Sequence, residues 1–209
     1  MRRSVLAVLW LLVLIAILAA LGSWWFLARP SGEGEPAGRE ERGEVGGPFQ
    51  LTDHTGRRVS DAEFRGRWLL LFFGYTSCPD VCPTALGTAA VAMEELGPLA
   101  ERLQPMFVTL DPERDTPDVL AAYVAQFHPA ILGLTGTPDE IASVAKAYRV
   151  FYRKAVPEGG KESDYLLDHS AYLYLVDPEG KFVRVFTHTQ SAEDIAQAIR
   201  AAMGEATSG

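Results

Sequence analysis

The sequence predicts an α/β sandwich, and two features of it carry this prediction. Apolar runs that suit strands alternate with segments of helical periodicity. In addition, the run at 68–75 is almost continuously apolar, as expected of a strand buried on both faces, and it leads into the chain's only two cysteines and then a helix. A strand that ends in a close cysteine pair before a helix is the layout of a thioredoxin-type site. We therefore predict a thioredoxin-like three-layer α/β/α sandwich.

The first elements follow from turn chemistry and apolar spacing. Residues 49–53 and 57–59 are predicted as a hairpin, because the polar sequence Asp53-His54-Thr55-Gly56 between them suits a tight turn. The buried strand at 68–75 comes next. A helix is predicted over 83–96, where apolar residues recur near helical spacing at Ala85, Leu86, Ala89, Met93 and Leu96.

The middle of the chain repeats a strand–helix pattern. A second core strand is predicted at 105–110, and a short one at 132–135. Each is followed by a helix, at 116–127 and 137–148, that opens with the triplet Thr-Pro-Asp. Threonine suits the N-cap, proline the first turn, and the acid the positive end of the helix.

The last elements close the sandwich. Residues 150–154 are predicted to be extended. Strands at 172–176 and 182–186 flank Asp177-Pro178-Glu179-Gly180, which is a good turn sequence for an antiparallel hairpin. A terminal helix is predicted over 191–203, with a serine at its N-cap. In such a sheet, ligands gather at the carboxyl ends of the strands, and the cysteines follow such an end.

The segment 1–29 is predicted to be a cytoplasmic tip and transmembrane anchor helix. Its apolar stretch from Val5 to Leu27 would give ~34 Å of helix, enough for a bilayer core of ~30 Å. The apolar core of a secretory signal is usually only about 7–15 residues, so an uncleaved anchor is preferred and a cleaved signal is the alternative. Arg2 and Arg3 predict a cytoplasmic N-terminus and an exported domain.

Three further segments complete the predicted organisation. Gly, Pro and Glu dominate residues 30–48, which are predicted to be a flexible linker because they cannot bury a core. Residues 49–203 are the thioredoxin-like domain, and residues 204–209 are a C-terminal tail. No Arg/Ser-rich presequence precedes the apolar stretch, which favours the bacterial inner membrane, with the domain in the periplasm, over the mitochondrial intermembrane space.

The predicted exported part is acidic. Of the 19 Lys and Arg residues, Arg2, Arg3 and Arg29 precede residue 30, which leaves 16 against 27 Asp and Glu, a formal charge of −11. This charge argues against nucleic acid and anionic lipid surfaces as partners of the domain.

The cysteines lie in Thr76-Ser77-Cys78-Pro79-Asp80-Val81-Cys82-Pro83, with the spacing C-x-x-x-C. Proline disfavours helical conformation in the residue before it, so neither Cys78 nor Cys82 is expected inside a helix. We place Cys82 at the N-cap and Pro83 at the first helical position. Both sulfurs would then lie near a helix N-terminus, where the partial positive charge favours thiolates.

Two thiolates suit Cu(I), zinc or iron–sulfur centres, but structural zinc normally takes four protein ligands. Cu(I) tolerates fewer ligands, so one imidazole would complete a site. His54, His128 and His188 are assigned to turns and element ends without a metal role. His169 stands just before the strand at 172–176, beside the predicted cysteine loop. Spacing alone does not decide whether it is a metal ligand or a histidine of the core. Asp168 is either the residue that orients this imidazole or a loop-capping acid.

At this point the residues resemble a known family, the Sco/SenC copper proteins of respiratory-oxidase assembly. Three segments carry the resemblance in the right order: the cysteine motif at 73–83, Leu110-Asp111-Pro112-Glu113-Arg114-Asp115-Thr116-Pro117, and Asp164-Tyr165-Leu166-Leu167-Asp168-His169-Ser170. The resemblance implies that Cys78, Cys82 and His169 bind one copper ion, as Cu(I) or Cu(II). The second motif is interpreted as structural, as a strand end and a helix cap.

The resemblance implies a membrane-anchored metallochaperone and not a turnover enzyme. It would receive copper from an upstream donor and assemble the binuclear copper site of cytochrome c oxidase subunit II. The alternative is a thiol–disulfide oxidoreductase, in which Cys78 and Cys82 reduce the cysteines of that apo copper site. A peroxiredoxin-like peroxidase is disfavoured because the pattern around Cys78 differs, and a structural disulfide is disfavoured because so small a loop would stabilise little.

Overall fold

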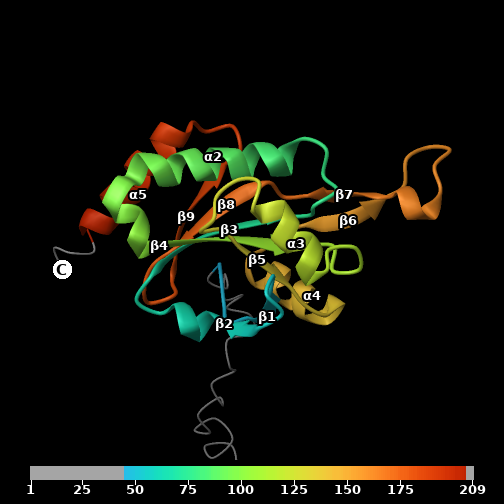
Figure 1. Ribbon diagram of the computed structural model, residues 1–209, viewed down its shortest axis with the longest axis horizontal. Helices are drawn as coiled ribbons and strands as arrows, with labels where there is room; N and C mark the ends of the chain where they lie inside the picture. Colours follow the sequence, from blue (N-terminus) through green and yellow to red (C-terminus); the bar gives the residue numbers. More distant parts are fainter. Residues whose placement is uncertain (1–44, 206–209) are drawn as a thin grey trace, which may run out of the picture. The chain divides into compact units, whose positions relative to one another are not determined.

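A mixed sheet forms the centre of the computed structural model, which describes residues 45–205 (Figure 1). In these residues the sheet has seven strands in the order β2-β1-β5-β4-β3-β8-β9. The strands are β1 (Gln50–Asp53), β2 (Arg58–Ser60), β3 (Trp68–Gly74), β4 (Leu103–Thr109), β5 (Leu132–Thr135), β8 (Tyr172–Val176) and β9 (Phe182–Thr187).

The direction of the strands confirms the predicted topology. β3 runs parallel to β4, and β4 runs parallel to β5. The β8–β9 hairpin adds to the other side of β3 in antiparallel fashion, and the β1–β2 hairpin pairs with β5 in the same way. β3 is therefore a central strand, and all seven of its residues are buried, which explains its continuous apolar sequence.

The helices α2 (Val81–Leu96), α3 (Pro117–Val124), α4 (Pro138–Ala147) and α5 (Ala192–Glu205) cover both faces of the sheet. α2 lies alongside α5 (Figure 1), on the face toward which Gly74 of β3 points. α3 covers the same face, because Leu120 of α3 contacts Gly133 of β5. The opposite face packs on the end of α4, where the ring of Tyr148 lies 5.3 Å from that of Phe73. This arrangement confirms the predicted three layers.

The helix caps agree with the sequence, with one exception. Thr116, Thr137 and Ser191 accept backbone hydrogen bonds at the starts of α3, α4 and α5, as predicted. The prediction that Cys82 is an N-cap is wrong: α2 begins at Val81, and Cys82 lies in its first turn. Proline is tolerated there, because the first four N–H groups of a helix have no partner within the helix.

The sequence predicted only one of the two strands of a second, smaller sheet. β6 (Tyr152–Ala155) matches the predicted extended segment, but its partner β7 (Leu166–His169) was not predicted. The two strands form an antiparallel ribbon whose connecting loop projects from the domain (Figure 1). The ribbon lies outside the seven-stranded sheet, so main-chain pairing with that sheet does not hold it in place.

The two ends of the domain differ slightly from the predicted bounds. The backbone N–H of Gly46 donates to the carbonyl of Ala147 at 2.9 Å, so the end of the segment assigned to the linker contacts the domain. α5 continues to Glu205, two residues beyond the predicted end of the last helix. The predicted anchor at 5–27 and linker residues 30–44 lie outside the described residues. Within 45–205, no helix is long and apolar enough to cross a membrane.

Candidate metal centre

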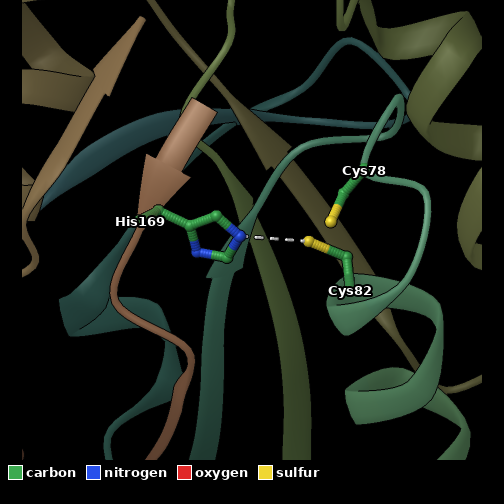
Figure 2. A group of neighbouring side chains, drawn as sticks. All are labelled: Cys78, Cys82 and His169. Carbon is green, nitrogen blue, oxygen red and sulfur yellow. Dashed lines mark hydrogen bonds between the residues drawn. The ribbon is translucent and has the colours of Figure 1, made fainter. Parts of the chain in front are cut away.

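Three side chains with donor atoms meet at the carboxyl end of β3. The Sγ atoms of Cys78 and Cys82 and a ring nitrogen of His169 all lie within 4.8 Å of one another. Figure 2 shows the two sulfurs side by side, with the imidazole of His169 pointing toward them from the end of β7. The structure thus brings together the three residues predicted from the sequence, over a separation of 87 positions between Cys82 and His169.

The two cysteines differ in exposure. Cys78 lies in the loop after β3, where its backbone N–H closes a turn with the carbonyl of Tyr75 at 3.2 Å, and its side chain is partly exposed. Cys82 is 0% exposed in the first turn of α2. Cys78 is therefore the sulfur that solvent or a partner reaches first.

Gly74, the last residue of β3, has no side chain, and the sulfur of Cys82 lies where a side chain would begin. A Cβ atom at this position would lie 2.6 Å from the Cys82 Sγ and 3.0 Å from the rings of Phe72 and Phe107. Both rings are fully buried and cannot give way easily. The position of the buried sulfur therefore requires glycine here.

The imidazole of His169 is held in one tautomer by its own strand end. Its Nδ1 lies 3.0 Å from the carbonyl oxygen of Ser170, which can only accept, so Nδ1 carries the proton. Nε2 then presents a lone pair, 3.5 Å from the Cys82 Sγ. Metal-bound histidines are commonly oriented through the other ring nitrogen in this way.

The pKa values of the two thiols are shifted in opposite directions. A hydrogen bond from Cys82 lowers the pKa of the Cys78 thiol well below its usual range, although burial opposes this effect. The same hydrogen bond, together with burial, raises the pKa of Cys82. Cys78 is thus the thiolate, the form that attacks disulfides and binds metals.

The assignment of Asp168 as the orienter of the imidazole is wrong. Successive side chains of a strand point to opposite faces, so Asp168 points away when His169 faces the sulfurs. Its carboxylate instead accepts from the guanidinium of Arg153 on β6, with both Nε and Nη2 at 2.9 Å. The main-chain carbonyl of Ser170 orients the imidazole in its place.

Sequence reasoning missed the role of Asp115, which lies in the motif interpreted as a strand end and helix cap. Asp115 is 1% exposed, and its carboxylate accepts from the backbone N–H of Thr76 at 3.0 Å and from the Thr76 hydroxyl at 2.6 Å. The Thr109 hydroxyl at the end of β4 also donates to it, at 2.6 Å. Asp115 therefore anchors the cysteine loop to the neighbouring strand. Only its position in the second motif pointed to it.

The other histidines lie outside the ligand group. His54 and His128 accept hydrogen bonds through Nδ1 from the backbone N–H groups of Gly133 and Ala130. His188 lines the same groove of about 430 Å³ as His169 but does not join the three donors. Within residues 45–205, His169 is the one histidine grouped with the cysteines.

Comparisons with known proteins identify the relatives of this chain. The model of the SCO1/SenC family matches residues 37–204. The protein sco1 of Schizosaccharomyces pombe is 43% identical over 159 residues, which cover 76% of this chain and 60% of that protein. The chain thus spans less than two thirds of the length of this relative.

Solved structures share the fold. The structure of Bradyrhizobium japonicum ScoI with copper bound is 42% identical, with a TM-score of 0.69 over 75% of this chain and 98% of that one. BsSco is described as having a disulfide switch and as a member of the Sco family of cytochrome c oxidase assembly proteins. It is 26% identical with a TM-score of 0.59, over 76% of this chain and 92% of that one. On the family match and these relatives, the chain belongs to the SCO1/SenC family.

Proposed function

We propose that this protein is a membrane-anchored copper metallochaperone that assembles the binuclear copper site of cytochrome c oxidase subunit II. The observation that carries this proposal is the meeting of two sulfurs and one imidazole nitrogen within 4.8 Å. Copper-bound structures of relatives with the same fold support it.

The donor set fits copper better than the other metals that thiolates bind. Structural zinc normally needs four protein ligands, and the described part of the chain brings only three donors together. Two thiolates and one imidazole suit Cu(I), and thiolate with imidazole also occurs in Cu(II) centres. Cys78, Cys82 and His169 would hold one ion, with the half-exposed Cys78 facing an incoming partner.

The partners follow from the same proposal. Copper would enter from an upstream donor and leave to the apo copper site of subunit II through stepwise exchange of thiolate ligands. The apolar segment at 5–27 would form the helix that anchors the chain in the inner membrane, with the domain in the periplasm. The acidic charge of the exported part opposes binding to nucleic acid.

Copper loading of the full chain tests the proposal. We expect one copper ion per reduced wild-type chain, measured by elemental analysis after removal of unbound metal. Cys78→Ser, Cys82→Ser and His169→Ala should each lower the copper content or the affinity by at least tenfold. His128→Ala is the matched control, because within residues 45–205 its ring is outside the ligand group and accepts a hydrogen bond from the backbone of Ala130. Wild-type copper binding in all three site variants would overturn the proposal.

A second function, thiol–disulfide exchange, is favoured by the asymmetry of the two cysteines. Cys78 is partly exposed and is the thiolate, whereas Cys82 is buried beside it. The Cys78 thiolate would attack a partner disulfide to form a mixed disulfide, and Cys82 would then attack the Cys78 sulfur and release the partner. Two electrons and the Cys82 proton would pass to the partner, which takes its second proton from water. The products are a Cys78–Cys82 disulfide and a reduced partner dithiol.

His169→Ala separates the two functions, because thiol exchange needs only the cysteines. If copper transfer is the main role, the variant loses copper and fails to restore oxidase assembly while its disulfide reductase rate stays unchanged. Normal oxidase assembly by a variant that no longer binds copper would favour thiol exchange and refute copper transfer.

A further inference from the structure

The strand that carries His169 needs an anchor outside the main sheet. β7 pairs only with β6, in a two-stranded ribbon whose loop projects from the domain. A two-stranded ribbon is marginally stable by itself. Residues 170–171 tie the His169 end of β7 to β8 of the main sheet, so the side chains that hold the ribbon against the domain act on its other end and on the angle of the strand.

Several contacts between the ribbon and the second motif meet at Tyr165, immediately before β7. Its hydroxyl donates to the Asp111 carboxylate at 2.8 Å, and its carbonyl accepts from Arg114 Nη1 at 3.0 Å. The Arg114 guanidinium carbon also lies 3.8 Å from the centroid of the Tyr165 ring, and Arg114 Nε pairs with Asp111. Asp111 is 2% exposed and Tyr165 8%, so the hydrogen bond between them is shielded from water.

The same arginine reaches toward the metal centre. The guanidinium carbon of Arg114 lies 5.9 Å from the centroid of the Tyr75 ring. The Tyr75 ring in turn meets the His169 imidazole edge-to-face, with centroids 5.8 Å apart. Arg114 thus lies between Tyr75, which begins the cysteine loop, and Tyr165, which immediately precedes the strand that carries His169.

We propose that Arg114 and Tyr165 are positioning residues that clamp the β6–β7 ribbon, through Asp111, so that His169 stays over the two sulfurs. Opening the clamp withdraws the imidazole and leaves a site of two thiolates. The inference rests on the proposed copper function and adds a way to regulate copper release. With the clamp closed, the site offers three ligands to copper. With the clamp open, it offers two, and a partner's ligand can take the third position.

Tyr165→Phe in the full chain is the sharpest test, because it removes only the hydroxyl that bonds Asp111. One buried hydrogen bond to a charged acceptor corresponds to roughly tenfold in an equilibrium constant. We therefore expect the affinity for Cu(I), measured by competition with a chelator, to fall roughly tenfold, and the nitrogen hyperfine coupling in the Cu(II) spectrum to weaken. Tyr123→Phe is the matched control, because its buried hydroxyl has no hydrogen-bond partner in the described part of the chain.

A double-mutant cycle shows whether Tyr165 acts through the histidine. In the His169→Ala background, Tyr165→Phe should no longer change copper affinity, because the imidazole that it positions is gone. Arg114→Lys provides a second variant. Lysine keeps the charge but lacks the planar group that both stacks on Tyr165 and bonds its carbonyl, so we expect a loss in the same range as for Tyr165→Phe.

The outcomes separate this inference from the proposed function. If His169→Ala loses copper but Tyr165→Phe and Arg114→Lys bind and report nitrogen coupling as the wild type does, the clamp is refuted and the copper site stands. An equal loss from Tyr165→Phe with and without His169 also refutes the clamp, because the tyrosine would then act on the fold in general. A wild-type chain that binds no copper refutes the proposed function and the clamp with it.

Discussion

The Nε2 atom of His169 lies 3.5 Å from the Sγ atom of Cys82, although 87 positions separate the two residues in the chain. Each group is placed by a different part of the fold. Cys82 is fixed in the first turn of α2 against Gly74, whereas His169 ends a ribbon outside the main sheet. The metal centre therefore joins sulfurs held by the main sheet and α2 to an imidazole at the end of a ribbon, where the short connection to β8 and side-chain contacts set its position.

Gly74→Ala should disturb the site and the fold together. The new methyl group would lie 2.6 Å from the Cys82 sulfur, so the sulfur or the first turn of α2 must move. We expect a loss of about 1–3 kcal/mol in the free energy of unfolding, the usual cost of overpacking a core, and weaker copper binding. Urea denaturation and copper titration measure the two effects.

Gly87→Ala is the control for that change. Gly87 lies in α2, and a Cβ atom there would meet nothing within 4 Å. Alanine favours helix over glycine, so this variant should be more stable by up to about 1 kcal/mol and should bind copper normally. Equal behaviour of the two glycine variants would contradict the role assigned to Gly74.

Asp115→Ala should loosen the cysteine loop. It leaves the Thr76 and Thr109 hydroxyls and the Thr76 backbone N–H without their acceptor in a buried place. We expect a loss of roughly 2–4 kcal/mol in the free energy of unfolding, because buried donors to a charged group lose their partner. Glu94→Ala, on the exposed side of α2, should change stability by less than about 0.5 kcal/mol. Thermal unfolding measures the stability of both variants. An equal loss in the two would contradict the role assigned to the Asp115 carboxylate.

The stability of the domain should fall in acid through Asp53. Burial by itself would raise the pKa of Asp53, but hydrogen bonds from the Thr55 hydroxyl and from the backbone at Arg57 and Thr55 outweigh it and lower the pKa. The folded state therefore binds this proton less readily than the unfolded state. The stabilisation is complete above the unfolded pKa of about 4 and is lost as the pH falls through the folded pKa. Asp53→Asn should be less stable than wild type at pH 7, and this difference should shrink by pH 3 in denaturant titrations.

The two cysteines should differ in reactivity when the chain is reduced and free of metal. Cys78 is partly exposed and its pKa is lowered, whereas Cys82 is buried and its pKa is raised. Iodoacetamide should modify Cys78 first and should still do so at pH 6, where a thiol with an ordinary pKa of about 8.5 is almost entirely protonated. Fragmentation mass spectrometry locates the modified sulfur, and first modification at Cys82 would contradict this order.

The sequence was sufficient to predict most of the fold. The strands of the seven-stranded sheet and the four helices appear within a few residues of their predicted positions, because buried strands and capped helices leave strong patterns. β7 left no such pattern. It is four residues long and pairs with a strand that is itself partly exposed, so neither alternation nor a continuous apolar run marks it.

The sequence by itself also identified Cys78 and Cys82 as ligands for a soft metal, and its resemblance to the Sco/SenC family selected His169 from the four histidines. Only the tertiary structure decided how they are arranged. It placed Cys82 inside α2, turned Asp168 away to Arg153, gave the orienting role to the Ser170 carbonyl, and set Asp115 beneath the cysteine loop. The reason is physical: hydrogen bonds between distant residues depend on the path of the chain through space, and local sequence encodes that path only through the packing of the whole domain.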